Sequence, residues 1–201
     1  MSSVLNRKKK KMQPLGYKEE IHVFNQQKVR RLNYATSLAE KAFLDIKLVS
    51  LQILHDKFGI GKKRIQRFES EINTLLEGDT SCSEMAYYLA EKKGIDLFGV
   101  DIPERELLGF QNMSYSNDVL PIQNKIKVIL GSVSDYIVLS VTTLKTVFKF
   151  SKKQIDEYVH WVKFYINSIS RGYENMIGVA SVLYHECNYC DKRFIGKFYE
   201  I

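Results

Sequence analysis

Four cationic side chains crowd into the first two turns of one predicted helix. Lys62, Lys63 and Arg64 open this helix and Arg67 follows them. Cations in a first helical turn oppose the helix dipole, which costs about 0.3 kcal/mol or more for each charge. Free backbone amides at a helix N-terminus, combined with such cations, form an anion site that suits a phosphate. The chemistry indicated by this cluster is therefore phosphate binding.

A second basic pair, Lys152-Lys153, opens another predicted helix ninety residues later. Asp156-Glu157 follows it and reduces the local charge, so one good phosphate contact is expected rather than two equal ones. The turn before each helix also resembles helix-turn-helix geometry, in which the second helix enters the major groove. The exposed readers would then be Arg64, Gln66, Arg67 and Glu69, with Gln154 and Glu157 in the second copy. The alternative is a solvated helix end that binds nothing.

Other cations precede these clusters. The N-terminus carries the basic run Arg7–Lys11, and Lys28, Arg30 and Arg31 follow near the end of a predicted helical stretch. The formal net charge of +7 and the pI of about 9.2 favour anionic partners. The predicted nucleic-acid-binding residues are Lys28, Arg30, Arg31, Lys62, Lys63, Arg64, Arg67, Lys152 and Lys153.

The sequence carries no recognised catalytic signature. GxSxG, P-loop, HExxH and GxGxxG strings are all absent, and neither His55 nor His160 has a nucleophile at a recognised spacing. We therefore expect a non-enzymatic protein without a cofactor. Paired acids such as Glu19-Glu20 are typical of solvated helix faces.

Cys187-Asn188-Tyr189-Cys190 resembles the opening of a C2H2 zinc finger, but no histidine follows it. A four-ligand zinc site would need His185, His160 or Cys82, or a second chain. The alternative, two reduced cysteines near a helix end, is the expectation. Three cysteines without a secretory leader indicate the cytoplasm of the host cell. The apolar stretch 128–144 is shorter than a bilayer span and contains Ser and Thr, so it predicts a buried helix and no membrane partner.

Hydrophobic spacing predicts the helices that position these residues. Residues 17–32 show helical periodicity, and residues 34–58 form a central helix with a wide apolar face. Gly59 is placed to end that helix in the left-handed conformation, and Gly61 to cap the next one, which ends at Gly78. A further helix runs from Ser81 or Ser83 to Gly94, and a connector contains one short helix near residues 104–110.

The second half of the chain repeats the first at a constant offset of ninety residues. Six of sixteen aligned positions in 50–65 are identical to those in 140–155, and similar residues continue as far as Ala90 and Ala180. Chance similarity between two amphipathic helix pairs is the alternative, but an unchanged offset favours duplication. The sequence thus predicts an all-α protein of two related helical-hairpin units, with a pseudo-two-fold internal repeat, packed as one helical bundle.

The predicted organisation has four parts. Residues 1–15 form a disordered basic tail, 16–95 the first helical repeat unit, 96–121 the connector and 122–201 the second unit.

The string from Leu54 to Ile65, LHDKFGIGKKRI, resembles short proteins of Gram-positive phages and prophages that carry a leucine-histidine-acid, phenylalanine-glycine, glycine-lysine-lysine-arginine pattern. The likeness covers about residues 50–70 and recurs less fully at 140–160, where Lys149 and Ser151 replace both glycines. It implies a mobile-element origin and a helical hairpin, and it supplies no catalytic residue.

The expected function is that of a phage or prophage accessory or regulatory protein that binds nucleic acid through a basic helix N-terminus. The alternative is a protein-binding module that inhibits or modulates a host or defence protein. An aromatic surface of Tyr87, Tyr88, Trp161, Tyr165 and Tyr173 would then carry the affinity. A homodimer is compatible with both functions.

Overall fold

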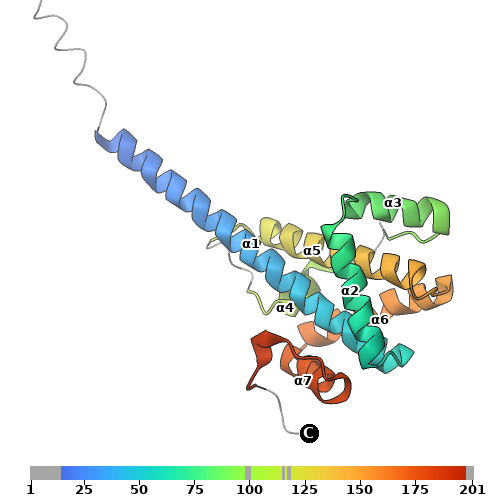
Figure 1. Cartoon of the computed structure of the whole chain (residues 1–201). Coiled ribbons are helices and arrows are strands. Elements are labelled where there is room, and N and C mark those ends of the chain that lie inside the picture. Colours follow the sequence, from blue (N-terminus) through green and yellow to red (C-terminus); the bar gives the residue numbers. More distant parts are fainter. Residues whose placement is uncertain (1–14, 98–100, 115, 117–118, 198–201) are drawn as a thin grey trace, which may run out of the picture.

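Helices account for all the regular structure in the part of the chain that the computed structural model describes, which is residues 15–97, 101–114, 116 and 119–197, with side chains from Val23 onward. In chain order they are α1 (Leu15–Phe58), α2 (Lys62–Glu77), α3 (Cys82–Lys93), α4 (Glu104–Phe110), α5 (Ile122–Thr146), α6 (Lys152–Ser170), α7 (Met176–Cys187) and the short 3-10 helix η1 (Lys192–Phe194). The predicted all-α class is confirmed (Figure 1).

The first helix is longer than the sequence periodicity suggested. The two predicted stretches, 17–32 and 34–58, form the single helix α1 of 44 residues. No glycine or proline lies between Tyr17 and Phe58, so nothing in this part of the sequence breaks the helix. The predicted basic tail lies outside the described residues except for Leu15, where α1 begins.

The predicted helix ends are confirmed. Gly59 ends α1 with a φ of +61°, and Gly61 is the N-cap of α2. Ser81 opens α3 with a capping box, in which its hydroxyl accepts from the Glu84 amide and its own amide donates to the Glu84 carboxylate. Gly94 ends α3 in the left-handed conformation, and α4 occupies the predicted place in the connector.

The apolar stretch 128–144 lies within α5, as predicted. Among the described helices α5 is long and apolar enough to cross a membrane by length and composition, but 61% of its most apolar stretch is buried inside the protein. A helix enclosed in this way by its neighbours has the composition of a core helix.

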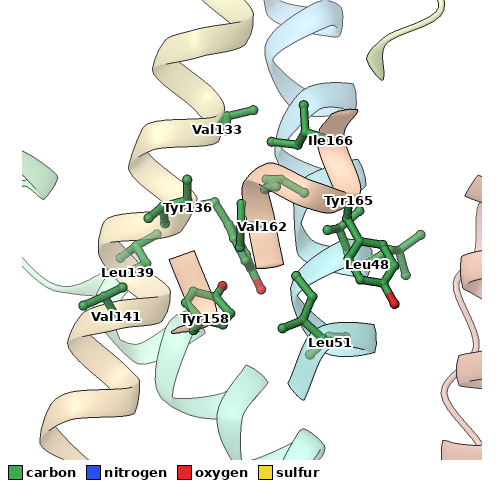
Figure 2. Close-up of a cluster of buried hydrophobic side chains, with 14 of the residues drawn as sticks. Leu48, Leu51, Val133, Tyr136, Leu139, Val141, Tyr158, Val162, Tyr165 and Ile166 are labelled. Carbon is green, nitrogen blue, oxygen red and sulfur yellow. The ribbon is translucent and has the colours of Figure 1, made fainter. Parts of the chain in front are cut away.

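The core forms where α1, α5 and α6 meet. Figure 2 shows Leu48 and Leu51 of α1 facing Val133, Tyr136 and Leu139 of α5, with Tyr158, Val162 and Ile166 of α6 closing the cluster. The rings of Phe43 and Tyr136 pack edge to face with their centroids 5.0 Å apart. Full burial of one such aliphatic side chain contributes about 1.5–3 kcal/mol, so this three-helix contact supplies much of the folding free energy.

The second and third helices of each half pack against the other half. α2 makes more contact with α5 than with α1, the helix it follows, and α6 packs against α1 as well as α4 and α5. α3 lies against α5, whereas α7 lies against α1. The two helices of each predicted hairpin, α1 with α2 and α5 with α6, therefore do not pack mainly against each other. Their apolar faces are covered in large part by helices of the other half.

The connector helix α4 packs against a further side of α6. Gly109 permits its close approach, since a Cβ at this position would lie 2.9 Å from the Cβ of Ser170. A distance below 3.0 Å would force one of the two helices to move.

One buried hydrogen bond joins α1 to α6. The Tyr158 hydroxyl donates to Ser50 Oγ over 2.8 Å, and both residues are completely buried. Burial raises the pKa of Tyr158 to about 12. Burial also raises the pKa values of Tyr136, Tyr165 and Tyr189 above that of an exposed tyrosine.

These tyrosines predict a loss of stability at alkaline pH. A phenol whose pKa is raised in the folded state contributes stability that is fully present below about pH 10 and is lost as the pH rises towards 12, because the unfolded chain then releases its proton first. Urea unfolding should show a fall in the free energy of unfolding above about pH 10. Tyr158→Phe should be less stable at neutral pH by about 1 kcal/mol and have a shallower alkaline loss. A pH-independent stability from about pH 8 to pH 11 would contradict this prediction.

The turn that follows α1 and the turn that follows α5 share a backbone conformation. Gly59 and Lys149 have φ values of +61° and +59°, and the amides of Ile60 and Phe150 donate to Leu54 O and Leu144 O at 3.0 Å in each case. An L side chain in the left-handed region costs about 1 kcal/mol.

The substitutions Gly59→Ala and Lys149→Gly should therefore have opposite effects. No atom lies within 4 Å of a Cβ at residue 59, so Gly59→Ala should destabilise through backbone strain alone, by about 1 kcal/mol. Lys149→Gly should stabilise by up to about 1 kcal/mol, less the contribution of the bond from Lys149 Nζ to Thr146 O. Urea midpoints measure both changes, and a shift of the same sign in both variants would contradict the shared geometry.

Candidate nucleic-acid interface

The two turns that precede the basic helices meet at one end of the bundle. Phe58 at the end of α1 and Phe150 in the turn after α5 pack with their ring centroids 5.1 Å apart and their planes inclined by 46°. Phe148 of the second turn contacts Phe68 of α2 at 6.0 Å. This apolar contact brings together helix starts that are ninety residues apart in the sequence, on the right side of Figure 1.

The cations of both helix starts consequently surround one end of the protein, here called the basic end. Its cationic residues are Lys57, Lys62, Lys63, Arg64, Arg67, Lys149, Lys152 and Lys153. Each of the predicted lysines and arginines in this set is exposed to solvent. Within the described residues, no ion pair involves Lys62, Lys63, Lys152 or Lys153.

The two arginines are held in place by an aromatic ring of the other half. The guanidinium carbons of Arg64 and Arg67 lie 5.5 Å and 5.9 Å from the centre of the Phe148 ring, within range of a cation–π interaction. Arg67 also lies 3.9 Å from Glu71 on its own helix. Both arginines remain exposed to solvent.

The amide groups that open α2 have no side-chain cap. The N-cap Gly61 has no side chain to accept from them, and no acidic residue lies in the first turn. α6 differs, because Ser151 and Gln154 form a capping box that uses the corresponding donors. The Arg64 amide donates to Gly61 O at 3.0 Å, so the start of α2 leaves one more amide than α6, that of Gly61, without a side-chain acceptor.

A cavity of about 530 Å³ lies between the two turns. Its charged lining consists of Lys57, Arg64, Lys149 and Glu157. Gln154 and the rings of Phe58, Phe148 and Phe150 also line it. Three cations against one carboxylate favour an anionic occupant. Because the cavity is open to solvent, it suits a group on the surface of a larger molecule.

The other predicted cations lie elsewhere. Lys28, Arg30 and Arg31 are exposed on α1, and Arg31 lies 27 residues before the end of the helix at Phe58. At 1.5 Å per residue, Arg31 and Phe58 are about 40 Å apart along the helix axis. The structure therefore does not bring the predicted basic residues together into one surface, and divides them into two groups.

The prediction that Glu69 is exposed and contacts nucleic-acid bases is wrong. Glu69 is half-buried and forms an ion pair with Lys47 of α1, so it faces the bundle and not a ligand. Gln66, Gln154 and Glu157 are exposed at the basic end.

The cysteine pair does not form a recognisable metal site. Cys187 is buried at the end of α7 and Cys190 is exposed beyond it. No group of three or more His, Cys, Asp or Glu side chains that could hold a metal ion occurs among the described residues. Burial raises the pKa values of both Cys82 and Cys187, which disfavours their reactive thiolate forms.

A buried charge network was missed at the sequence level. Asp45 of α1 is 2% exposed and accepts from Arg193 Nη1 at 2.7 Å, Lys41 Nζ at 2.9 Å and Gln111 Nε2 at 3.2 Å. Arg193 also binds Asp191, whose pKa is lowered by these bonds although burial acts in the opposite direction. This network ties η1 and the connector to α1. The only sequence signal was an isolated Asp at a position that the helical period places in the core.

No protein-family model, curated protein or solved structure matches the chain.

Proposed function

We propose that this chain is a non-enzymatic accessory or regulatory protein of a phage or prophage and that it binds nucleic acid through the basic end. The mobile-element part of this proposal rests on the resemblance around residues 54–65. The observation that carries the binding part is the meeting of the two turns, which gathers cations from both halves around one open cavity.

The energetics of these lysines favour a ligand over a purely structural role. Lys62, Lys63, Lys152 and Lys153 all lie in first helical turns, where each opposes the helix dipole by about 0.3–1 kcal/mol. They have no ion-pair partner in the described part of the chain to offset this cost. A phosphate backbone would supply the missing counter-charge, and the uncapped amides of α2 would add hydrogen bonds to it.

We also infer that the two halves are copies of one ancestral unit related by a pseudo-two-fold axis. Burial supports this, because residues 61–70 and 151–160 share the same order of buried, half-buried and exposed positions. The crossed packing supports it as well: α2 and α3 pack on α5 as α6 and α7 pack on α1.

The third helices match at a different offset from the one expected. The N-caps Ser81 and Asn175, and the left-handed C-caps Gly94 and Asn188, are each 94 residues apart. The counterpart of Ala180 is then Ala86, which is buried like it, and not Ala90. The four extra residues include the longer end of α6. On this inference α1 and α5 are equivalent, the axis runs between them, and both basic helix starts flank it.

Replacing the four unpaired lysines should separate binding from folding. In the variant Lys62→Gln, Lys63→Gln, Lys152→Gln, Lys153→Gln we expect binding to duplex DNA to weaken by at least about tenfold at low salt. The slope of log affinity against log salt should fall by about 0.9 for each phosphate that the variant no longer neutralises. The same variant should be more stable by about 1–2 kcal/mol, because four charges opposed to helix dipoles are removed.

A gain in stability excludes misfolding as the cause of weakened binding. The control variant Lys92→Gln, Lys93→Gln neutralises exposed lysines at the end of α3 and should bind like the parent chain. Fluorescence anisotropy with labelled duplex and single-stranded DNA measures the affinity. If the fourfold variant binds both as tightly as the parent, the basic end is not the interface.

A second candidate function, binding to a host or defence protein, is favoured by the outer face of α6. There His160, Trp161 and Phe164 form a run of edge-to-face ring contacts, with successive centroids 5.6 Å and 5.3 Å apart. Lys57 Nζ lies 4.0 Å from the centre of the Trp161 ring, and Phe164 is 51% exposed. Of the predicted aromatic surface, Tyr87, Tyr88 and Tyr173 are exposed, but Tyr165 is buried and donates to Asp56.

Phe164→Ser tests this candidate without disturbing the core. Because half of the Phe164 side chain faces solvent, the free energy of unfolding should change by less than about 1 kcal/mol. If the aromatic face binds a protein, capture of that protein from nuclease-treated host lysate should fall by at least about tenfold, as for an interface hot spot. Ile195→Ser, which replaces an exposed apolar side chain outside this surface, is the matched control. Equal capture by both variants and the parent excludes this face as the binding surface.

A further inference from the structure

The part of α1 that carries Lys28, Arg30 and Arg31 stands apart from the bundle. All residues from Val23 to Asn33, here called the arm, are exposed, including Phe24 at 67%. The first buried side chain of α1 among the described residues is Leu38. In Figure 1 this half of α1 extends away from the other helices, while the remainder runs through them. The arm is therefore accessible from every side.

The net charge of the protein resides in the N-terminal region that includes the arm. The first 37 residues contain nine Lys and Arg against two Asp and Glu, which accounts for the whole +7. The remaining 164 residues contain 21 of each sign and are formally neutral. The positive charge of the basic end is thus balanced elsewhere on the bundle, whereas that of the arm is not.

No cationic track joins the arm to the basic end along α1. Two lysines lie between them, and each pairs with an acid: Lys41 with Asp45 and Lys47 with Glu69. Glu40 and Asp56 lie on the same stretch. A polyanion that follows α1 from one basic region to the other would therefore meet no free lysine on the way.

The two basic regions are also held apart. α1 is a continuous helix, so the separation of about 40 Å between Arg31 and Phe58 is fixed by the helix and equals about 12 base pairs of duplex. The basic end lies beyond the C-terminus of α1, where α2 and α6 begin, whereas the arm presents its cations on the sides of the helix. The two regions therefore present their cations about 40 Å apart, so each can contact its own segment of nucleic acid.

We propose that the arm and the basic end of one chain bind two separate nucleic-acid segments and bridge them. This rests on the proposed function, since it takes the basic end as one of the two contacts. The arm supplies a second, independent phosphate-binding surface of the same chemistry, and α1 acts as the rigid spacer between the segments. The partner is thus a pair of duplexes, or two distant parts of one long duplex.

Energy transfer between duplexes tests this directly. One duplex of about 30 base pairs, more than twice the spacing of the two regions, carries a donor dye and a second carries an acceptor. The full chain is titrated into an equimolar mixture at low salt. Bridging should produce transfer at limiting protein, and excess protein should abolish it because each duplex then binds its own chain.

Two variants remove one region each. The arm variant is Lys28→Gln, Arg30→Gln, Arg31→Gln, and the end variant is Lys62→Gln, Lys63→Gln, Lys152→Gln, Lys153→Gln. Each should reduce transfer by at least about tenfold while still binding one duplex through its remaining region. Lys92→Gln, Lys93→Gln, Lys127→Gln, three exposed lysines outside both regions, is the matched control and should bridge like the parent.

The outcomes separate bridging from the proposed function. Transfer retained in either variant means that self-association joins the duplexes, and contradicts bridging by one chain. Binding without transfer in the parent, abolished in the end variant, overturns bridging and leaves the proposed function intact. If the arm variant loses retention on anionic phospholipid vesicles and binds and bridges DNA normally, the arm is a membrane contact and the inference is wrong. Binding of no duplex by the parent removes the proposed function itself.

Discussion

The mutual burial of α1 and α5 is the constraint on which the rest of the structure depends. α5 and the part of α1 from Leu38 to Leu54 are too apolar to face water, and each is covered by helices from both halves. Their contact is the most extensive between any two described elements, and α6 closes the core over it. Because α2 and α3 cover α5 while α6 and α7 cover α1, neither half has a complete core of its own. The chain is therefore best described as one bundle.

The basic end follows from this packing. α1 and α5 run side by side and end near each other, so the turns after them must meet, and Phe58 and Phe150 seal the contact. The helices that start from these turns then place their first residues, which the sequence makes cationic, around a common cavity. Repulsion between these charges acts against folding, and the burial of the aromatic rings beneath them offsets it. Such an arrangement stores electrostatic free energy that an anionic ligand would release.

The free half of α1 is a different kind of feature. This segment continues a helix whose other half is packed in the core. The direction of the free segment is therefore set by the packed half, without contacts between the free segment and the other helices. Helix formation in isolation is marginal over so short a length, but a helix already nucleated by tertiary packing can continue outward at little cost. The arm thus gains a defined position relative to the bundle, which a flexible tail would not have.

The sequence alone determined the helices and most of their ends. Its periodicity, together with Gly59, Gly61, Gly78, Ser81 and Gly94, predicted where α2 and α3 and the end of α1 lie, because caps and apolar spacing are local properties. It also identified the exposed cations at the starts of α2 and α6. Only the tertiary structure decided which helix covers which face, because an apolar face does not specify its partner helix. The hydrophobic pattern was equally compatible with hairpins that pack within each half and with the observed packing of each half on the other. For the same reason the Asp45–Arg193 pairing, the inward orientation of Glu69 and the separation of the two basic regions could not be predicted. They depend on distances between residues far apart in the chain, which exist only once the helices are packed.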